Sequence, residues 1–232
     1  MSPAPPARAS PFALMRDAVL DAWALIQPVD CLGCGAPDRA ICATCTIAFS
    51  DPGPTRVRCD VDPGVPVVAA ADYEGVARSA LLALKDAGRT DAARMLARLL
   101  PAAITTALAA EPPGVEIAWT PSRPAALRRR GFDPVREIVG AARLPASRVL
   151  AARWRTRSQK TLGRAERLAA GERFRARRRL DGRRFVLVDD VVTTGSTLAA
   201  CAEAIRAAGG EVVAAIAVCA PDLDRRAIRG TL

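Results

Sequence analysis

The chain has 232 residues, half of them apolar, and carries a formal net charge of +10 with no histidine. This length suits one medium-sized domain with a small appendage. No stretch reaches the roughly 18 apolar residues of a membrane span. The Pro-rich opening MSPAPPARAS lacks the pattern of a secretory signal peptide, so we expect a cytoplasmic protein without a membrane partner. The charge favours an anionic partner, although the near-exclusive use of arginine is equally compatible with a coding bias.

The first part of the chain is predicted in two pieces. Residues 1–27 are expected to form a disordered lead followed by an amphipathic helix over 11–27, which ends before Pro28. Residues 28–64 are expected to form a cysteine-containing module and its linker, since 51–66 is rich in proline and glycine.

Two Cys-x-x-Cys pairs dominate the module. Cys31 and Cys34 are separated by seven residues from Cys42 and Cys45. Four thiolates at this spacing are typical of a structural zinc site, with no open position for catalysis. The alternative is four free thiols. Cys59 has no partner pair, so its role stays open.

Residues 65–232 are expected to form the main domain, in which strands alternate with helices. The strands are predicted at 65–73, 115–121, 184–190 and 211–220, and the helices at 74–88, 91–110 (with a break at Pro101), 133–144 and 196–210. Their apolar runs are not interrupted by polar positions. This pattern predicts an α/β fold with a mostly parallel sheet covered by helices on both faces.

The stretch FVLVDDVVTTGSTLAAC, residues 185–201, carries the strongest functional signal. Asp189 and Asp190 are predicted at the carboxyl end of a strand, where ligands bind in open parallel sheets. The next residues lead into a helix whose first N–H groups lack intrahelical partners, which suits a phosphate. This turn consists of Thr193, Thr194, Gly195, Ser196 and Thr197. Carboxylates beside a phosphate site suit sugar hydroxyls or Mg²⁺. The alternative is an ordinary strand–turn–helix with exposed aspartates.

The segment VLVDDVVTTGST resembles the phosphoribosyl pyrophosphate (PRPP) motif of type I phosphoribosyltransferases. The segments DYEGVARSALLALKDAG, TPSRPAALRRRGFDPV and RTRSQKTLGRAERLAAGERF accompany it in that order. Together with the cysteines, they resemble the ComF family of competence-associated, phosphoribosyltransferase-like proteins. The resemblance implies a type I phosphoribosyltransferase-like domain that binds PRPP or ribose 5-phosphate with Mg²⁺ and transfers phosphoribosyl to a nucleobase-like acceptor.

Basic residues complete the predicted site. Arg128, Arg129 and Arg130, with Gly131, are expected to hold pyrophosphate through forked hydrogen bonds. The alternative for this group is a solvated basic loop. Lys85 is expected near phosphate, or else in a surface ion pair. The segment 155–174 resembles the mobile loop of the family, in which the contact residues are Gln159, Lys160 and Arg167.

The sequence leaves the activity open. As an enzyme, the chain would use Asp189, Asp190, Lys85 and Arg130 as its catalytic residues. No general base is evident, so either the acceptor needs little deprotonation or one of the aspartates serves as the base. Alternatively it is a non-catalytic PRPP or nucleotide sensor, a factor that handles single-stranded DNA or contacts DNA-uptake proteins, or a zinc-supported adaptor. Few aromatic residues are present for stacking bases.

Overall fold

A computed structural model describes residues 29–37, 39–49, 53–153 and 173–221. The predicted disordered lead and the helix over 11–27 lie outside these residues. In the described part of the chain, no helix is both long and apolar enough to cross a membrane.

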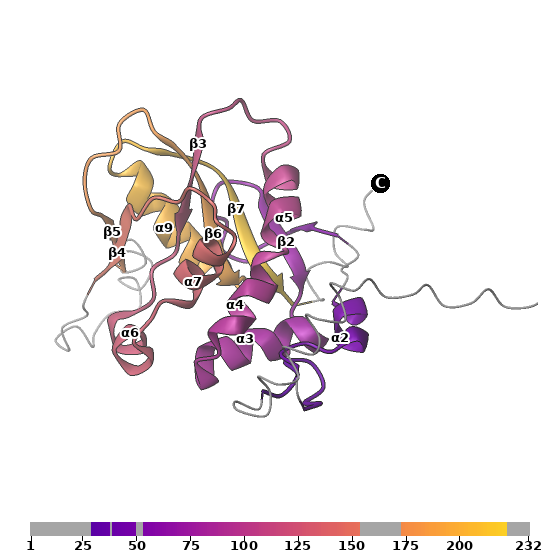
Figure 1. The fold of residues 1–232 in the computed structure, drawn as a ribbon. Helices are drawn as coiled ribbons and strands as arrows, with labels where there is room; N and C mark the ends of the chain where they lie inside the picture. The colour runs from indigo at the N-terminus through magenta and orange to yellow at the C-terminus, as the bar shows by residue number, and fades with distance from the viewer. Residues whose placement is uncertain (1–28, 38, 50–52, 154–172, 222–232) are drawn as a thin grey trace, which may run out of the picture.

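The main domain is built on a five-stranded sheet with the order β1-β2-β7-β6-β3 (Figure 1). Its four longer strands are parallel to one another, and β1 is antiparallel to β2. The strands span Thr55–Val57 (β1), Val67–Asp72 (β2), Val115–Trp119 (β3), Arg184–Val191 (β6) and Glu211–Ala220 (β7). Nine of the ten residues of β7 are buried, as expected for a central strand covered on both faces. The predicted fold class is therefore confirmed.

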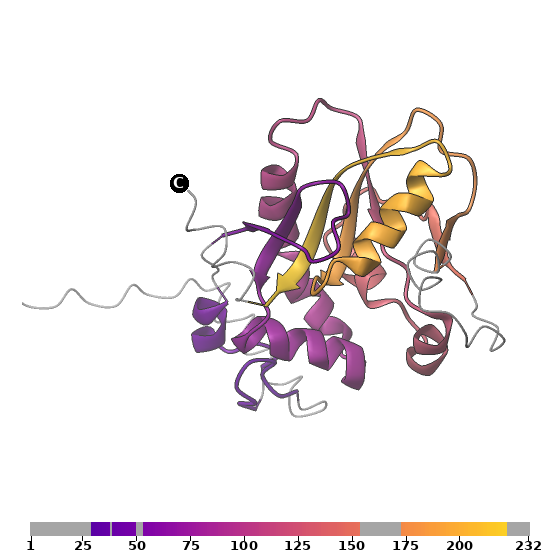
Figure 2. The same cartoon turned by 180° about the vertical axis from the view of Figure 1, so that it is seen from behind.

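Alternating residues of the central strands pack on opposite faces of the sheet. On β6, Val186 and Val188 belong to one apolar cluster, and Phe185 and Leu187 belong to the other. Four helices contribute to the first cluster: α3 (Gly75–Ala87), α4 (Thr90–Ala97), α5 (Leu100–Ala107) and α7 (Pro134–Ala141). Helix α9 (Ser196–Arg206) covers the second face (Figure 2). The two-stranded sheet of β4 (Leu150–Ala152) and β5 (Phe174–Ala176) packs beside it.

The break expected at Pro101 is present, whereas other local expectations were wrong. The helical stretch over 91–110 is divided into α4 and α5 just before Pro101, which lies in the first turn of α5, where its missing N–H costs nothing. Asp133 precedes α7 without capping it, because its side chain accepts a hydrogen bond from Ser122 N instead (2.9 Å). Part of the predicted linker forms β1, and the predicted arginine loop contains helix α6 (Pro124–Arg130).

The cysteine module packs against the main domain. Its Leu32 is 6% exposed and belongs to the apolar cluster that contains α3 and α4. The guanidinium of Arg89, the residue before α4, donates to Asp30 O of the module (2.5 Å). A Cβ atom on Gly33 would lie 3.0 Å from Val76 Cγ2 of α3. Helix α2 (Ala43–Ala48) carries the last cysteine of the module.

Candidate functional site

Asp189 and Asp190 lie at the carboxyl end of β6, beside the end of β3. Strand β3 pairs with β6 up to Trp119, and the next residue, Thr120, continues the ladder by donating its N–H to Val188 O (2.9 Å). Its hydroxyl then donates to Asp189 Oδ1 (2.6 Å). The same oxygen accepts the N–H of Asp190 (2.9 Å). The carboxylate of Asp189 is therefore fixed by two neighbours before any ligand arrives.

The environment of Asp189 favours its protonated form. The residue is 7% exposed. Burial, and secondly the negative charge of Asp190, raise the pKa of Asp189 to about 7, against the lowering effects of the Thr120 and Asp190 hydrogen bonds and of Lys85. Asp189 can therefore gain or lose a proton near neutral pH. Histidine usually has this role, but the chain contains no histidine.

Lys85 reaches the same place from another element. It lies in the last turn of α3, and its Nζ is 2.8 Å from Asp190 Oδ2. Both side chains are about one fifth exposed (21% and 19%). Helices α3 and α4 lie at the end of the sheet toward which β2 and β7 point (Figure 1). Lys85 therefore forms an ion pair, which was one of its two predicted roles, and this pair places its charge beside the candidate site, as the other role requires.

The hydroxyl-rich turn leads from β6 into α9. Thr193 and Thr194 are exposed, and Gly195 precedes the helix with a φ of +81°, a left-handed conformation that suits glycine. The hydroxyls of Thr194 and Ser196 are 3.2 Å apart. The N-cap residue Gly195 has no side chain, and the Ser196 N–H donates a long hydrogen bond to Thr194 Oγ1 (3.4 Å). The N–H groups of the first turn of α9 carry the positive end of the helix dipole, an arrangement suited to an anion.

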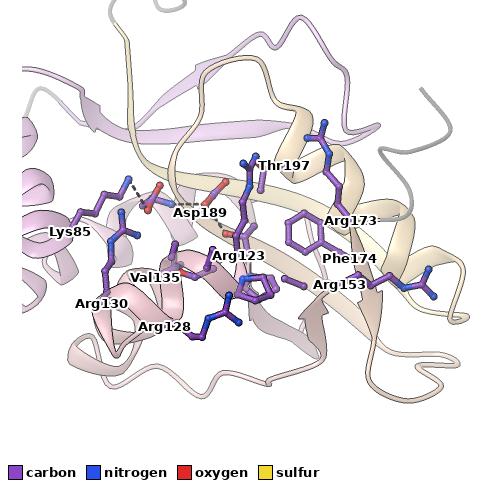
Figure 3. A pocket seen from close by; sticks show the side chains of 18 of the residues that line it. Lys85, Arg123, Arg128, Arg130, Val135, Arg153, Arg173, Phe174, Asp189 and Thr197 are labelled. Carbon is purple, nitrogen blue, oxygen red and sulfur yellow. Dashed lines mark hydrogen bonds and ion pairs between the residues drawn. The ribbon is translucent and has the colours of Figure 1, made fainter. Parts of the chain in front are cut away.

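A cavity of about 600 Å³ lies beside these groups, and Thr197 is the one residue of the hydroxyl-rich turn in its lining, which does not include Thr193, Thr194, Gly195 or Ser196. Asp189, Asp190 and Thr197 line it together with Lys85 and several arginines. Figure 3 shows Lys85 and Arg130 at one end, Asp189 in the middle, and Arg153 and Arg173 at the other end. The lining arginines are Arg123, Arg128, Arg130, Arg153 and Arg173. A ligand with several negative charges fits this lining best.

The three arginines predicted to bind pyrophosphate lie on α6 rather than on a loop, and only two of them line the cavity. Arg128 and Arg130 line the cavity, whereas Arg129 does not. Within the described residues, the buried Nε of Arg130 has no hydrogen-bond partner, so a donor remains available beside the cavity. Gly131 is not among the lining residues either. It ends α6 in a left-handed conformation with a φ of +78°.

Other site residues differ in how well the sequence indicated them. Gln159, Lys160 and Arg167 lie outside the described residues. The lining residues that were not predicted include Thr120, Arg123, Arg153 and Arg173. For the first two the signal was present, since they immediately follow the strand that neighbours β6. Arg153 precedes the predicted mobile loop 155–174 and Arg173 lies at its end, and Arg153 N donates to Arg173 O (2.8 Å).

A second cavity of about 590 Å³ lies along β5 and α9. It shares Arg153 and Phe174 with the first cavity. Three further arginines line it, opposite Glu203: Arg175, Arg178 and Arg179. This part of the surface therefore also favours an anionic ligand.

The four cysteines of the module lie close together. The sulfur atoms of Cys31, Cys34, Cys42 and Cys45 are all within 4.8 Å of one another, and those of Cys34 and Cys42 are 3.7 Å apart. A tetrahedral site with Zn–S bonds of about 2.3 Å places its sulfurs about 3.8 Å apart. Backbone N–H groups of Gly33 and Cys42 donate to Cys31 Sγ (3.4 and 3.3 Å). The cluster is therefore compatible with zinc.

Residues 126–230 match the family model of the phosphoribosyl transferase domain. These residues are therefore similar to that domain, in agreement with the resemblance found in the sequence. The match includes both aspartates and the hydroxyl-rich turn, but it begins after Lys85 and the cysteines. It supports the type I superfamily and does not distinguish the ComF family within it. No curated protein matches the chain.

Proposed function

We propose that this phosphoribosyltransferase domain binds PRPP with Mg²⁺ and transfers its phosphoribosyl group to a nucleobase-like acceptor. One observation carries the proposal. The paired carboxylates at the end of β6, the open start of α9 and the unpartnered guanidinium N–H of Arg130 lie around one cavity. A sugar with a phosphate at one end and a pyrophosphate at the other presents complementary groups to all three.

Each part of the cavity suits one part of PRPP. The N–H groups and hydroxyls of residues 193–197 suit the 5-phosphate. Asp189 and Asp190 suit the ribose hydroxyls, which donate hydrogen bonds to carboxylates. Arg128 and Arg130 suit pyrophosphate, because guanidinium forms forked, charge-assisted bonds to phosphate oxygens. Lys85 adds a compact positive charge beside them.

The proposed transfer follows from this placement. The bond between C1 of the ribose and the pyrophosphate oxygen breaks, and both electrons leave with pyrophosphate. A nitrogen lone pair of the acceptor forms the new bond to C1, and the acceptor loses a proton. Lys85 and Arg130 stabilise the charge that develops on pyrophosphate. One of the two aspartates is the group best suited to accept the proton, since the described lining of the cavity holds no other carboxylate.

The residues present fit a magnesium ion. Asp189 and Asp190 are hard oxygen ligands of the kind that Mg²⁺ prefers, in a cavity whose other charged lining residues are cations. These two carboxylates would hold the ion near the ribose hydroxyls. When bound, Mg²⁺ would neutralise charge on the pyrophosphate.

The cysteine cluster fits a structural zinc ion. Its four thiolates occupy every position of a tetrahedral site, so the ion would stabilise the module rather than take part in transfer. The contacts of Leu32 and Gly33 with the main domain support this role, because they fix the module to the helical side of the sheet.

The experiment titrates PRPP with Mg²⁺ into the wild type and into the Asp189→Asn/Asp190→Asn double variant by calorimetry. We expect binding to the wild type and a loss of at least about tenfold in the variant. A wild type that does not bind PRPP contradicts the proposal. Pyrophosphate release with a panel of nucleobases then distinguishes transfer from binding alone, since a sensor binds PRPP and releases nothing.

Single-stranded DNA is a second candidate ligand, and the arginines of the second cavity favour it. It ranks below PRPP because Phe174, the one aromatic residue in the described lining, is 7% exposed and offers little surface for stacking bases. The test is the salt dependence of oligonucleotide affinity. Contacts with several phosphates require a steep slope, and a slope near zero contradicts this candidate.

A further inference from the structure

The segment Cys59–Gly64, which we call the brace, lies directly behind the hydroxyl-rich turn. It leaves β1 and contacts both the turn and the helix that follows it. Val61 N–H donates to Thr194 O (2.8 Å). At the other end of the brace, Arg206 Nη2 of α9 donates to Gly64 O (3.2 Å). The sequence indicated only a linker here, so these contacts assign the segment a place in the site.

Gly195 is in close contact with the brace. A Cβ atom at this position would lie 2.5 Å from Val61 O and 2.6 Å from Cys59 Cβ, distances that real Cβ atoms do not reach. Its left-handed φ of +81° disfavours a side chain independently. Glycine is therefore required here by the packing of the protein itself, and not only by the approach of a ligand.

The hydrogen bond from Val61 fixes the direction of one peptide group. A trans peptide is planar, and its C=O and N–H point in opposite directions. The Thr194 carbonyl points at the brace, so the N–H of the same peptide, which belongs to Gly195, points away from it. Within the described residues, no acceptor receives this N–H. This N–H therefore lies without an acceptor on the side of the turn away from the brace.

We infer that the brace is a positioning element for the phosphate monoester of the ligand. It holds the Thr194–Gly195 peptide so that the Gly195 N–H and the first N–H groups of α9 point to the same anion. Without the brace, this peptide would have to be oriented during binding, and affinity would fall by that cost. The inference rests on the proposed function, since it assigns the 5-phosphate to this turn.

A pair of substitutions at one position tests the inference. Val61→Pro removes the N–H that holds Thr194 O, whereas Val61→Ala keeps it. The side chain of Val61 is 42% exposed, so its truncation alone changes little. The probes are ribose 5-phosphate, which needs the turn, and inorganic pyrophosphate, which is expected to use Arg128 and Arg130.

We expect Val61→Pro to bind ribose 5-phosphate about tenfold more weakly and pyrophosphate as the wild type does. Val61→Ala should match the wild type with both probes. Unchanged ribose 5-phosphate affinity in Val61→Pro overturns the inference. Equal losses for both probes also overturn it, because they indicate general damage to the fold. A wild type that binds neither probe instead contradicts the proposed function, and this inference with it.

A measurement on the wild type covers the case in which Val61→Pro does not fold. Hydrogen exchange of the Val61 amide should slow when ribose 5-phosphate is added, since a ligand that uses the Gly195 N–H stabilises the same peptide. Pyrophosphate should have little effect on this amide. Exchange that does not respond to ribose 5-phosphate, under conditions where the probe is bound, overturns the inference.

Discussion

Lys85 Nζ and Asp190 Oδ2 are 2.8 Å apart, and this ion pair joins the last turn of α3 to the end of β6. The ammonium neutralises one of two adjacent carboxylates and also lowers the pKa of the other, Asp189. Binding of PRPP and Mg²⁺ would bring the positive ion close to Asp190 and the negative pyrophosphate close to Lys85. Lys85 therefore affects the site before and after the ligand binds.

Lys85→Gln is expected to reduce PRPP turnover, measured as kcat/KM, by roughly tenfold to a hundredfold, because a cation beside the leaving pyrophosphate is lost. It should also raise the pKa of Asp189, so that the acidic limb of the pH–rate profile moves to higher pH. Asp86→Asn is a suitable control, since it changes an exposed charge on the next residue of α3. Equal effects of the two variants would contradict the role of Lys85.

Arg130 and Arg129 form a matched pair on α6. Arg130→Gln removes a guanidinium that lines the cavity, and we expect pyrophosphate affinity to fall by about tenfold. Arg129→Gln removes the same charge from a position outside the lining, and it should leave affinity within about twofold. Calorimetry with pyrophosphate measures both. Comparable losses in the two variants would indicate a general effect of charge instead of a local contact.

The raised pKa of Asp189 predicts a pH-dependent stability difference between wild type and Asp189→Asn. A carboxyl whose pKa is higher in the folded state stabilises the fold below its unfolded pKa, near 4, and loses that contribution as pH rises through about 7. The unfolding free energy of the wild type, relative to Asp189→Asn, should fall by about 3 kcal/mol between pH 4 and pH 8. Urea titrations at a series of pH values measure it, and a constant difference contradicts the prediction.

The pKa of Glu116 is shifted in the opposite direction to that of Asp189, so its effect on stability has the opposite pH dependence. Hydrogen bonds from Arg183 (2.7 and 2.6 Å) and Ser147 (2.6 Å) lower the pKa of Glu116 to about 2. A carboxyl with a lowered pKa stabilises the fold above its unfolded pKa, near 4.5, and loses that contribution as pH falls toward 2. Because the pair is partly exposed, Glu116→Gln should cost only about 1 kcal/mol at pH 7, and the difference from wild type should shrink at acidic pH.

Glu116 lies at the opposite end of β3 from Thr120, so its substitution also serves as a control for the site. PRPP affinity of Glu116→Gln at pH 7 should equal that of the wild type. A loss of affinity without a further loss of stability would show that the two ends of the strand are coupled.

Cys34→Ser should abolish zinc binding, whereas Cys59→Ser should retain about one zinc per chain, since Cys59 lies outside the cluster. Chelation of zinc from the wild type should lower the melting temperature, because the ion stabilises only the folded module. Metal analysis and thermal unfolding measure these effects. Full metal content in Cys34→Ser would contradict a four-cysteine site.

The sequence predicted the parts of the site that adjoin one another along the chain. Asp189, Asp190 and the turn into α9 follow one strand, and the position of ligands beyond strand ends in parallel sheets is a general property of the fold. Lys85 stood out because lysine is rare in this chain, and the structure brings it to Asp190.

Contacts between distant segments were not predictable in the same way. β1 has three residues in a stretch rich in proline and glycine, and only its pairing with β2 makes it a strand. Helix α6 has Pro124 at its start and Gly131 after its end, but seven residues give too short a periodic pattern to distinguish it from a loop. The positions of Arg153 and Arg173 depend on how β4 and β5 pack against α9, which no local pattern reveals.

The central position of β7 has a consequence for how this domain can be divided. Residues 126–230 contain β6 and β7, but their outer neighbours β3 and β2 come earlier in the chain. A fragment limited to these residues would expose unpaired N–H and C=O groups along both strands, and such bare edges promote aggregation. Any transplant of this ligand site into another protein would therefore need to carry residues 65–125 with it.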